Sequence, residues 1–400
     1  MALERVCQLD TAVQHRRARA AVAALFLTNG ALFANLLPRY PEIKTDLGMS
    51  NALYGMAIAA FSAGALAAGP TAAALIRRFR SSRVAVAGSI GIAVFVLVAA
   101  LAPSAFSLAA ALFVAGAADA VTDVGQNAHA LRLQRKYGRS IINSLHAVWS
   151  AGAVLGGAMG AAAIALDIPR ATHLAVSAAV FSAVVLAAYP FLLRGADEDD
   201  RPAAGVGAPK GPGFAVYATL IALVFIAICG AVVEDAGSSW ATVYLRDSIG
   251  TSGALAASGY IAMVGCQFVG RLIGDRLVDR FGERTVARAG GFITAAGMGA
   301  ALAYPSAIGT IAGFAAAGFG VATLVPAAMH GADQLPGLRA GTGLTAVTWL
   351  MRVGFVSSPP VVGLIADTTS LRVGLLVVPA AGAGVMLLAG ALSPRRPPPR

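Results

Sequence analysis

Two acids and an amide recur at even spacing inside one long apolar stretch, residues 104–130. Asp119, Asp123 and Asn127 follow one another at intervals of four residues. On a helix this spacing places all three on one face about 12 Å tall. Acids in such a stretch exchange protons or bind polar solutes, whereas the plainer alternative is a structural charge at a helix end, paired with Arg132 or a loop arginine.

A second acidic pair, Glu234 and Asp235, closes the apolar stretch 214–236. Adjacent helical residues point about 100° apart, so we expect one of the two acids to face a cavity. The run that follows, residues 237–240, holds a glycine, two serines and Trp240, and such a run can interrupt a helix. The alternative is a solvated rim, with Trp240 as an interfacial aromatic residue.

An arginine also lies deep in an apolar stretch, about twelve residues into 340–366. Arg352 shares one predicted helix face with Thr345, Thr348 and Trp349. A lone arginine at that depth requires an anion, which is either a carboxylate of the chain or an anionic solute. We expect this polar and aromatic face to line a cavity; a purely structural ion pair is the alternative.

Polar side chains in two further stretches complete the candidates: Asn29 and Asn35 in 20–38, and Asn143, His146 and Trp149 in 140–166. His146 carries the only imidazole placed well inside a predicted helix, and an imidazole gains and loses a proton near neutral pH. Packing through hydrogen bonds is the alternative for His146 and for the two asparagines of 20–38. Gly152, Gly156 and Gly160 form a GxxxGxxxG run, which lets helices approach closely.

The composition shows which elements position these side chains. Apolar residues make up 58% of the 400 residues and charged residues 12%, too few to cover a soluble globule. The sequence instead predicts an all-α membrane protein, because twelve apolar stretches are each long enough to cross a bilayer. These are 20–38, 53–76, 84–102, 104–130, 140–166, 171–193, 214–236, 254–277, 286–304, 306–330, 340–366 and 372–392.

The basic residues predict the orientation of these helices. Of the 30 Lys and Arg residues, two lie deep within spans (Arg271 and Arg352), and five fall in the loops of one side: Arg39, Lys44, Arg170, Arg246 and Arg372. The remaining 23 lie on the other side, so the positive-inside rule places both termini in the cytoplasm. The net charge of +11 is therefore explained by topology, and we expect no nucleic-acid partner. No cysteine has metal-binding spacing, and we expect neither a metal nor a cofactor.

An internal repeat divides the chain into two halves of six helices. Matches recur at a constant offset of 202, among them Arg78-Phe79 with Arg280-Phe281. The polar and Pro/Gly-rich run 194–213 reads as a cytoplasmic linker between a bundle at 1–193, preceded by a short tail at 1–19, and a bundle at 214–400. Two parallel repeats predict alternating access around a site at the repeat interface.

One loop carries a family resemblance. Residues 274–284 read GDRLVDRFGER, which is similar to the loop signature of the major facilitator superfamily, with Asp279, Arg280, Gly282 and Arg284 on the pattern. The resemblance implies the twelve-helix fold of that superfamily. The first-half copy, residues 77–83, departs from the signature, with Arg80 at the glycine position. The stretch 127–157 also resembles a bacterial branch distantly similar to fucose–proton symporters.

The repeat separates scaffold residues from residues of the site, because a binding site is one asymmetric object. Apolar residues occupy the positions matched to Asp119, Asp123, Asn127, Glu234 and Asp235, and a serine matches Arg352. Arg271 and Asp275 are four residues apart beside the loop signature. We expect these two residues to neutralise each other and to serve a gate or the scaffold.

The leading hypothesis is a secondary transporter that moves a small polar solute, sugar-like or similar, across a bacterial inner membrane. Protons are the expected coupling ion, the lipid bilayer the expected surroundings, and a monomer the expected state. Efflux of amphipathic compounds is the alternative within the same class. Outside it stand a membrane-embedded prenyltransferase that uses Asp119 and Asp123, and a receptor or scaffold without transport.

Overall fold

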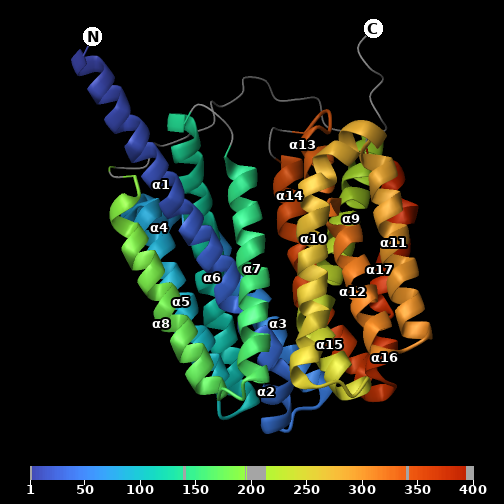
Figure 1. The fold of residues 1–400 in the computed structure, drawn as a ribbon. Coiled ribbons are helices and arrows are strands. Elements are labelled where there is room, and N and C mark those ends of the chain that lie inside the picture. Colours follow the sequence, from blue (N-terminus) through green and yellow to red (C-terminus); the bar gives the residue numbers. More distant parts are fainter. Residues whose placement is uncertain (1, 138–140, 194, 196–212, 339–341, 393–400) are drawn as a thin grey trace. The chain divides into compact units, whose positions relative to one another are not determined.

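The computed structural model describes residues 2–137, 141–193, 195, 213–338 and 342–392. In this part of the chain every regular element is helical, and no strand occurs (Figure 1). The helices form two compact units. Unit 1 comprises Met1–Arg39 and Ala60–Asp199, and unit 2 comprises Tyr40–Ala59 and Asp200–Arg400.

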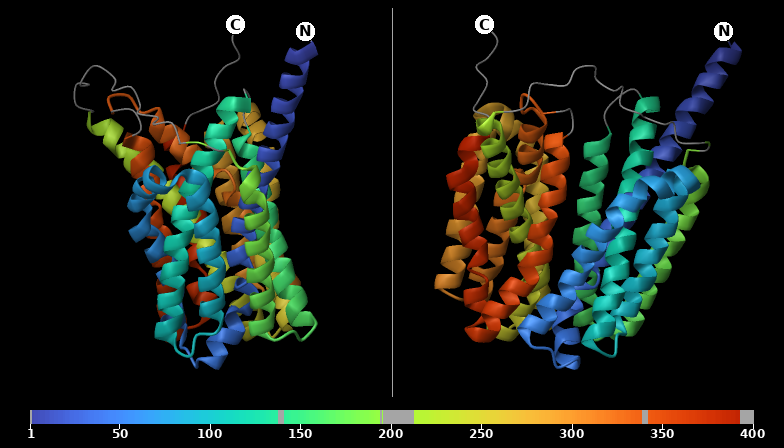
Figure 2. Two further views of the ribbon diagram at one scale, coloured as in Figure 1. Left: turned by 90° about the vertical axis from the view of Figure 1, so that its left-hand side faces the viewer. Right: turned by 180° about the vertical axis from the view of Figure 1, so that it is seen from behind.

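Unit 1 holds most helices of the first half of the chain. They are α1 (Ala2–Ala34), α4 (Ala72–Phe79), α5 (Ser81–Ala100), α6 (Ala105–Tyr137), α7 (Ile142–Ala165) and α8 (Arg170–Ala188), with the 3-10 turns η1 (Leu37–Arg39), η2 (Gly69–Thr71) and η3 (Tyr189–Phe191). Helix α3 (Asn51–Ala68) is shared, since the division between the units falls within it. The long helices of unit 1 run side by side in all views (Figure 2).

Unit 2 holds α2 (Tyr40–Asp46) and the helices of the second half. They are α9 (Phe214–Val243), a π-helical turn (Tyr244–Ser248), α10 (Gly253–Phe281), α11 (Glu283–Ala303), α12 (Ala307–Val321), α13 (Leu324–Asp333), α14 (Thr342–Leu350), α15 (Arg352–Thr368), α16 (Leu371–Gly374), α17 (Val377–Leu388) and η5 (Ala389–Ala391). Of the predicted linker 194–213, only Gly195 and Gly213 are among the described residues, so the boundary between the predicted bundles stays a prediction.

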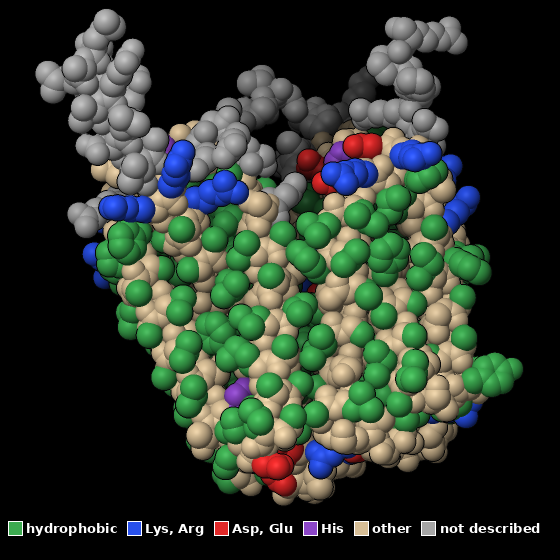
Figure 3. Space-filling model, in the orientation of Figure 1, with side chains coloured by type: hydrophobic (Ala, Val, Ile, Leu, Met, Phe, Trp, Pro, Cys, Tyr) green, Lys and Arg blue, Asp and Glu red, His purple; other side chains and the backbone are tan. Residues whose placement is uncertain are grey.

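The twelve predicted spans are confirmed, since twelve helical segments of the described chain are long and apolar enough to cross a membrane. On the face seen in Figure 3, apolar side chains cover the middle of the helices and most charged side chains lie at their ends. One predicted boundary was wrong, because helix α9 continues to Val243 rather than ending at 236. The spans 306–330 and 340–366 agree with the membrane segments Ala307–Asp333 and Thr342–Thr368, and each of these consists of two helices joined by a short turn.

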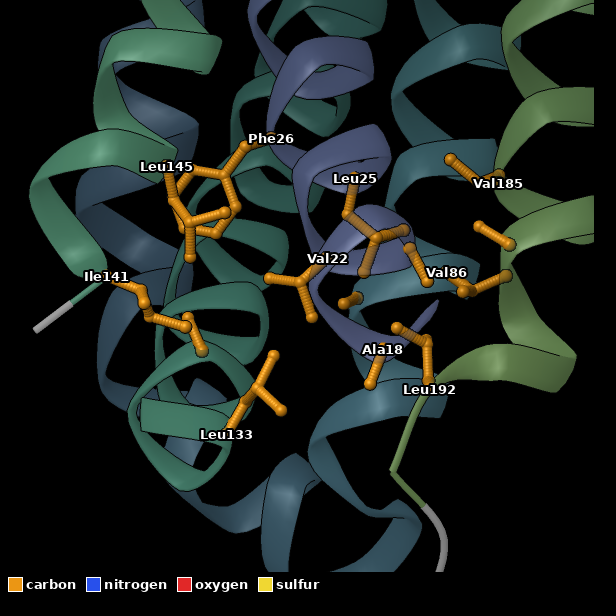
Figure 4. Packing of buried hydrophobic residues seen from close by; sticks show 14 residues of the cluster. Ala18, Val22, Leu25, Phe26, Val86, Leu133, Ile141, Leu145, Val185 and Leu192 are labelled. Carbon is orange, nitrogen blue, oxygen red and sulfur yellow. The ribbon is translucent and has the colours of Figure 1, made fainter. Parts of the chain in front are cut away.

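Helix α1 is the central packing element of unit 1. It contacts α5, α6, α7 and α8. Val22, Leu25 and Phe26 of α1 are fully buried, and Leu133 of α6 and Val185 of α8 pack in the same cluster (Figure 4). Because lipid tails are as apolar as these side chains, close van der Waals packing rather than release of water holds such a cluster together.

Glycines allow α1 and α7 to approach closely. A Cβ atom at Gly152 would overlap the Leu27 carbonyl oxygen, and one at Gly156 would overlap the Ala31 carbonyl oxygen. From the opposite side, a Cβ atom at Gly30 would overlap the carbonyl oxygen of Trp149. The close helix approach predicted from the glycine run is therefore confirmed, and its partner is α1.

The predicted repeat is visible in the hydrogen bonds that begin the helices. The amide of Leu53 donates to Ser50 Oγ at 3.2 Å, and the amide of Leu255 donates to Ser252 Oγ at 3.4 Å. Serine at this position satisfies an amide that has no partner within the helix. The sequence matches at offset 202 thus preserve helix starts.

The repeat is also visible in the turns. Gly48 and Gly250 both adopt positive φ, at 57° and 79°. Arg80, in the turn between the second and third spans, has φ 75° and ψ 147°. Gly282, at the matched position of the second half, has φ 81° and ψ 152°. The first half therefore forces an arginine into a backbone conformation that is essentially reserved for glycine.

Candidate functional site: polar networks within the two units

A chain of hydrogen bonds links three helices of unit 1. The indole Nε1 of Trp149 on α7 donates to Asn29 Oδ1 on α1, at 2.7 Å. The amide Nδ2 of Asn29 donates in turn to Asp119 Oδ1 on α6, at 2.9 Å. Asn29 is buried, whereas Trp149 and Asp119 are partly exposed. The structure thus brings together three residues that the sequence proposed separately.

The glycine contacts explain why this network forms. Gly30 follows Asn29 directly, and its contact with the Trp149 backbone places the first turns of α7 against the C-terminal end of α1. The short distance between the helices lets the indole of Trp149 reach an asparagine side chain. Close backbone packing and the polar contact are therefore parts of one arrangement.

The other acid of α6 lies one turn further along the same helix. Asp123 Oδ1 accepts from Asn127 Nδ2 at 2.9 Å and from Gln126 Nε2 at 3.5 Å. Asp123 and Asn127 are both half-buried, like Asp119. The even spacing in the sequence thus produces a continuous acidic and amide surface on α6.

The remaining candidates of unit 1 differ in their surroundings. Asn35 is fully buried; it donates to the Ala31 carbonyl at 2.8 Å and pairs with His173 Nε2 of α8 at 2.9 Å. Asn35 therefore makes hydrogen bonds within its own segment and to a neighbouring helix, which was the alternative to a cavity role. His146 is exposed, and its ring meets Phe26 edge-on at 5.3 Å. The side chain of Asn143 lies outside the described residues.

Unit 2 contains a second network, centred on Glu234 of α9. Gln267 Nε2 of α10 donates to Glu234 Oε2 at 2.8 Å, and the Arg271 guanidinium lies 3.7 Å from the same oxygen. The expected pairing of Arg271 with Asp275 was wrong, because the carboxylate that Arg271 meets belongs to α9 and not to its own helix. The ion pair is partly open, with 24% of the Glu234 side chain exposed.

Asp235 has a different environment from its neighbour Glu234. It is 8% exposed, and Ser239 Oγ lies 3.5 Å from its Oδ1. Its Oδ2 is buried and accepts no hydrogen bond of ordinary geometry within the described part of the chain, although the Ser358 hydroxyl lies near the carboxyl group. No ion pair of Asp235 occurs there either, so Glu234 holds an arginine and Asp235 does not.

The predicted alternatives at this helix end were wrong. Helix α9 is not interrupted after Asp235, because it runs on to Val243. Trp240 is not an interfacial residue: its side chain is fully buried and meets Tyr54 edge-on at 4.8 Å. The Tyr54 hydroxyl donates to the Ser239 carbonyl at 2.6 Å, so α3 covers this part of α9.

The predicted face on the eleventh span is divided by a helix break. Thr345, Thr348 and Trp349 lie on α14, whereas Arg352 begins α15. At the break, the amide of Gly354 donates to the Met351 carbonyl three residues back, so the four side chains do not follow one regular helix as expected. Arg352 is half-buried and makes no hydrogen bond or ion pair with the residues the structure describes.

The loop signature has a structural role in unit 2. Gly282 joins α10 to α11, and Arg284 donates to the carbonyls of Leu392 and Gly390, at 3.1 and 2.7 Å. Arg280 lies over the Phe281 ring at 5.3 Å, as Arg78 lies over Phe79 at 5.6 Å in unit 1. Asp275 and Asp279 are at least partly exposed.

Sequence reasoning missed two polar residues that hold these helices. Gln267 is buried and binds Glu234; the matched position in the first half is Ala65, so the repeat comparison could have identified it. His129 is fully buried. Its Nε2 accepts from the Leu193 amide at 3.1 Å, so its Nδ1 carries the proton and donates to Ser81 Oγ at 2.9 Å. Among the described residues, no group of three His, Cys, Asp or Glu could hold a metal ion.

Comparison with known proteins places this arrangement in a family. Residues 22–277 match the family model of the Major Facilitator Superfamily. A relative from Sinorhizobium fredii (strain NBRC 101917 / NGR234), described as an uncharacterized transporter, is 31% identical over 375 residues, covering 93% of this chain and 97% of the relative. The chain therefore belongs to the Major Facilitator Superfamily.

Two solved structures share the fold at low sequence identity. The nucleoside transporter NupG is 13% identical with a TM-score of 0.70, covering 94% of this chain and 98% of that chain. The transporter FucP, solved in the outward conformation, is 17% identical with a TM-score of 0.61, covering 94% and 99%. These two structures share the fold alone. The family match and the relative described as a transporter show that the chain is a multi-pass membrane transporter and not an enzyme, which removes the prenyltransferase alternative.

Proposed function

We propose that this protein is a secondary active transporter that moves a small, hydroxyl-bearing polar solute across a bacterial inner membrane by alternating access, coupled to protons. The observation that carries the proposal is the hydrogen-bonded chain of Trp149, Asn29 and Asp119. It joins an indole, an amide and a carboxyl group that belong to three membrane-spanning helices of unit 1.

The chemistry of this chain suits a sugar-like solute. A carboxylate accepts hydrogen bonds from hydroxyl groups, an amide both donates and accepts, and an indole offers a flat apolar face beside a single N–H donor. A few convergent polar groups among apolar walls are typical of small-molecule sites. Trp149 and Asp119 are partly exposed, so a solute can reach them.

The asymmetry of the network supports a binding role over a scaffold role. The positions matched at offset 202 to Asn29, Asp119 and Trp149 are Ala231, Val321 and Met351. None of these can rebuild the network in the other half. Helix starts and turns recur between the halves, whereas this network does not.

Two carboxyl groups are the proposed proton carriers. Asp119 accepts from a neutral amide, and Asp235 has one buried oxygen that accepts no hydrogen bond of ordinary geometry in the described chain. Glu234 is a weaker candidate, because Arg271 holds it in an ion pair. Arg352 has no ion-pair partner in the described chain, so its charge is available to a solute or to a carboxyl group during the transport cycle.

A structural neighbour supports this class of solute. NupG, which shares the fold, is a nucleoside transporter, and a nucleoside carries the hydroxyl groups of a sugar. For this chain we therefore propose a solute that carries such hydroxyl groups, without naming the compound.

Counterflow in proteoliposomes tests the proposed solute class. Vesicles loaded with one unlabelled compound from a panel of pentoses, hexoses, nucleosides and amphipathic compounds are diluted into a trace of the same labelled compound. We expect transient accumulation with at least one pentose, hexose or nucleoside, which is lost in Asn29→Ala and retained in Asp333→Asn, a variant at an exposed end of α13. Accumulation of amphipathic compounds alone would refute the polar-solute proposal and favour efflux.

A further inference from the structure

Unit 1 contains a cavity at the corner where α4 turns into α5. Its volume is about 380 Å³, and its lining includes Arg80, Ser82 and Arg83 from the turn and Tyr189, Leu192 and Leu193 from the chain that follows α8. No acidic side chain is among the described residues that line it. The cavity therefore combines two positive charges with an aromatic and aliphatic wall.

Arg80 holds its position in this cavity against its own backbone preference. Its φ of 75° and ψ of 147° belong to a region that only glycine adopts readily, and Gly282 occupies the matched turn of unit 2 with φ 81° and ψ 152°. The side chain of Arg80 is exposed and makes no hydrogen bond or ion pair with the described residues. No contact within the described chain accounts for an arginine here.

The neighbouring Arg83 is also available for a ligand. Its side chain makes one hydrogen bond with the described residues, a long one from Nε to the Tyr189 hydroxyl at 3.4 Å. In unit 2 the signature arginine, Arg284, is instead occupied by two carbonyl oxygens at the end of α17 and η5. A guanidinium has five N–H donors, so both cavity arginines keep most of theirs free.

The end of α5 adds to the positive potential of the cavity. Arg80 is the residue before the helix, and no side chain caps the first amides of α5. Uncapped amides and the helix dipole favour an anion at such an end. The arginines, the cavity and the helix start thus point to one kind of ligand.

We propose that this cavity binds a phosphate group, supplied by an anionic phospholipid headgroup or by a free phosphate. Arg80 and Arg83 would bind the phosphate oxygens, because a guanidinium matches their geometry. Tyr189, Leu192 and Leu193 would pack against the apolar part of a lipid. The charge pattern of the sequence places this end of unit 1 at the cytoplasmic surface, where basic pockets between helices meet anionic lipids.

The test exchanges the two arginines for smaller, uncharged residues. The double variant Arg80→Gly, Arg83→Thr places glycine in the strained turn, as in unit 2, and removes both charges. The control, Arg276→Ala with Arg288→Ala, removes two exposed arginines of unit 2 that have no contact in the described chain. Thermal unfolding of the purified full chain in detergent is followed against added phosphatidylglycerol, phosphatidylcholine or inorganic phosphate.

We expect phosphatidylglycerol, but not phosphatidylcholine, to stabilise the wild type and the control at the same concentration. The double variant should need roughly 30-fold more, since each basic residue near an anionic surface contributes about 1 kcal/mol. If inorganic phosphate alone shows this difference, the site binds the free anion. Equal concentration dependence of wild type and double variant with both anionic probes, or no effect of either probe, overturns the proposal.

A second readout separates ligand binding from a structural role. Without lipid, Arg80→Gly should unfold at a higher temperature than the wild type, because it relieves the backbone strain while it weakens binding of the anion. If Arg80 only stabilised the fold, Arg80→Gly should unfold at a lower temperature than the wild type. A lower unfolding temperature of Arg80→Gly without lipid would therefore contradict the argument.

Discussion

At the scale of single residues, the networks explain why polar side chains are tolerated within apolar helices. An isolated acid inside a membrane span costs ~2.5–3.5 kcal/mol on insertion scales. Asn29 gives Asp119 a donor, and Gln267 and Arg271 give Glu234 two. Asp119 and Glu234 are thus each held by a neighbouring helix, and a change at the neighbour should alter what the acid can do.

The variant Trp149→Phe tests the first network. It keeps an aromatic ring but removes the N–H that donates to Asn29 Oδ1. We expect the KM for the transported solute to rise about 2- to 12-fold, as one net hydrogen bond contributes ~0.5–1.5 kcal/mol. A double-mutant cycle with Asn29→Ala, followed by the free energy of unfolding because that variant is expected to lose transport, provides the control. Strictly additive effects would show that the two side chains act independently.

At the scale of helices, close packing positions the network. The α1–α7 contact depends on glycines whose missing side chains leave room for backbone of the opposite helix. Any side chain at these positions would separate the helices and move Trp149 away from Asn29. Helix packing and the polar network should therefore fail together.

The variant Gly152→Ala tests this dependence. Its new methyl group would meet the Leu27 carbonyl, and we expect a loss of ~1–3 kcal/mol of stability, measured as a lower unfolding temperature. Gly265→Ala on α10 is the matched control, because a Cβ atom there meets nothing within 4 Å. The control should be neutral or stabilising by up to ~1 kcal/mol. Similar destabilisation by both variants would count against a packing role of Gly152.

The sequence predicted the helices well because each span carries its own apolar pattern. The repeat could be found because Ser50, Ser252 and the glycines of the turns preserve helix starts. The end of α9 could not be found, because Glu234 and Asp235 resemble a solvated helix end unless the partners on α10 are known. Helix breaks such as that at Met351 also depend on tertiary contacts rather than on local sequence.

Candidate site residues were predictable by type but not by partner. The absence of repeat counterparts identified Asp119 and Glu234, and spacing alone placed Asp123 with Asn127. The link from Trp149 to Asp119 through Asn29 joins residues 90 and 120 positions apart. Such pairings depend on which helices pack together, and the apolar pattern of a span does not show which helix is its neighbour.

At the scale of the whole molecule, the distribution of charge predicts the orientation in the membrane. Of the 30 basic residues, 23 are assigned to one side by the sequence. The excess of Lys and Arg is expected in the cytoplasm.

Cysteine labelling tests this orientation. In a variant with Cys7, Cys229 and Cys266 replaced by serine, a cysteine at the exposed Leu166 should react with a membrane-impermeant maleimide in intact cells. A cysteine at the exposed Arg276, near the C-terminal end of α10, should react only after the membrane is opened. The opposite pattern would reverse the predicted topology.

In the proposed transport cycle, the carboxyl group of Asp119 couples solute movement to protons. The most direct measurement follows solute uptake and internal pH together in proteoliposomes under an imposed pH gradient, for the wild type and Asp119→Asn. We predict that the wild type accumulates solute with simultaneous proton entry. Asp119→Asn should retain counterflow but lose gradient-driven accumulation, and Asp333→Asn should behave as the wild type. Undiminished, pH-driven accumulation by Asp119→Asn would contradict the claim.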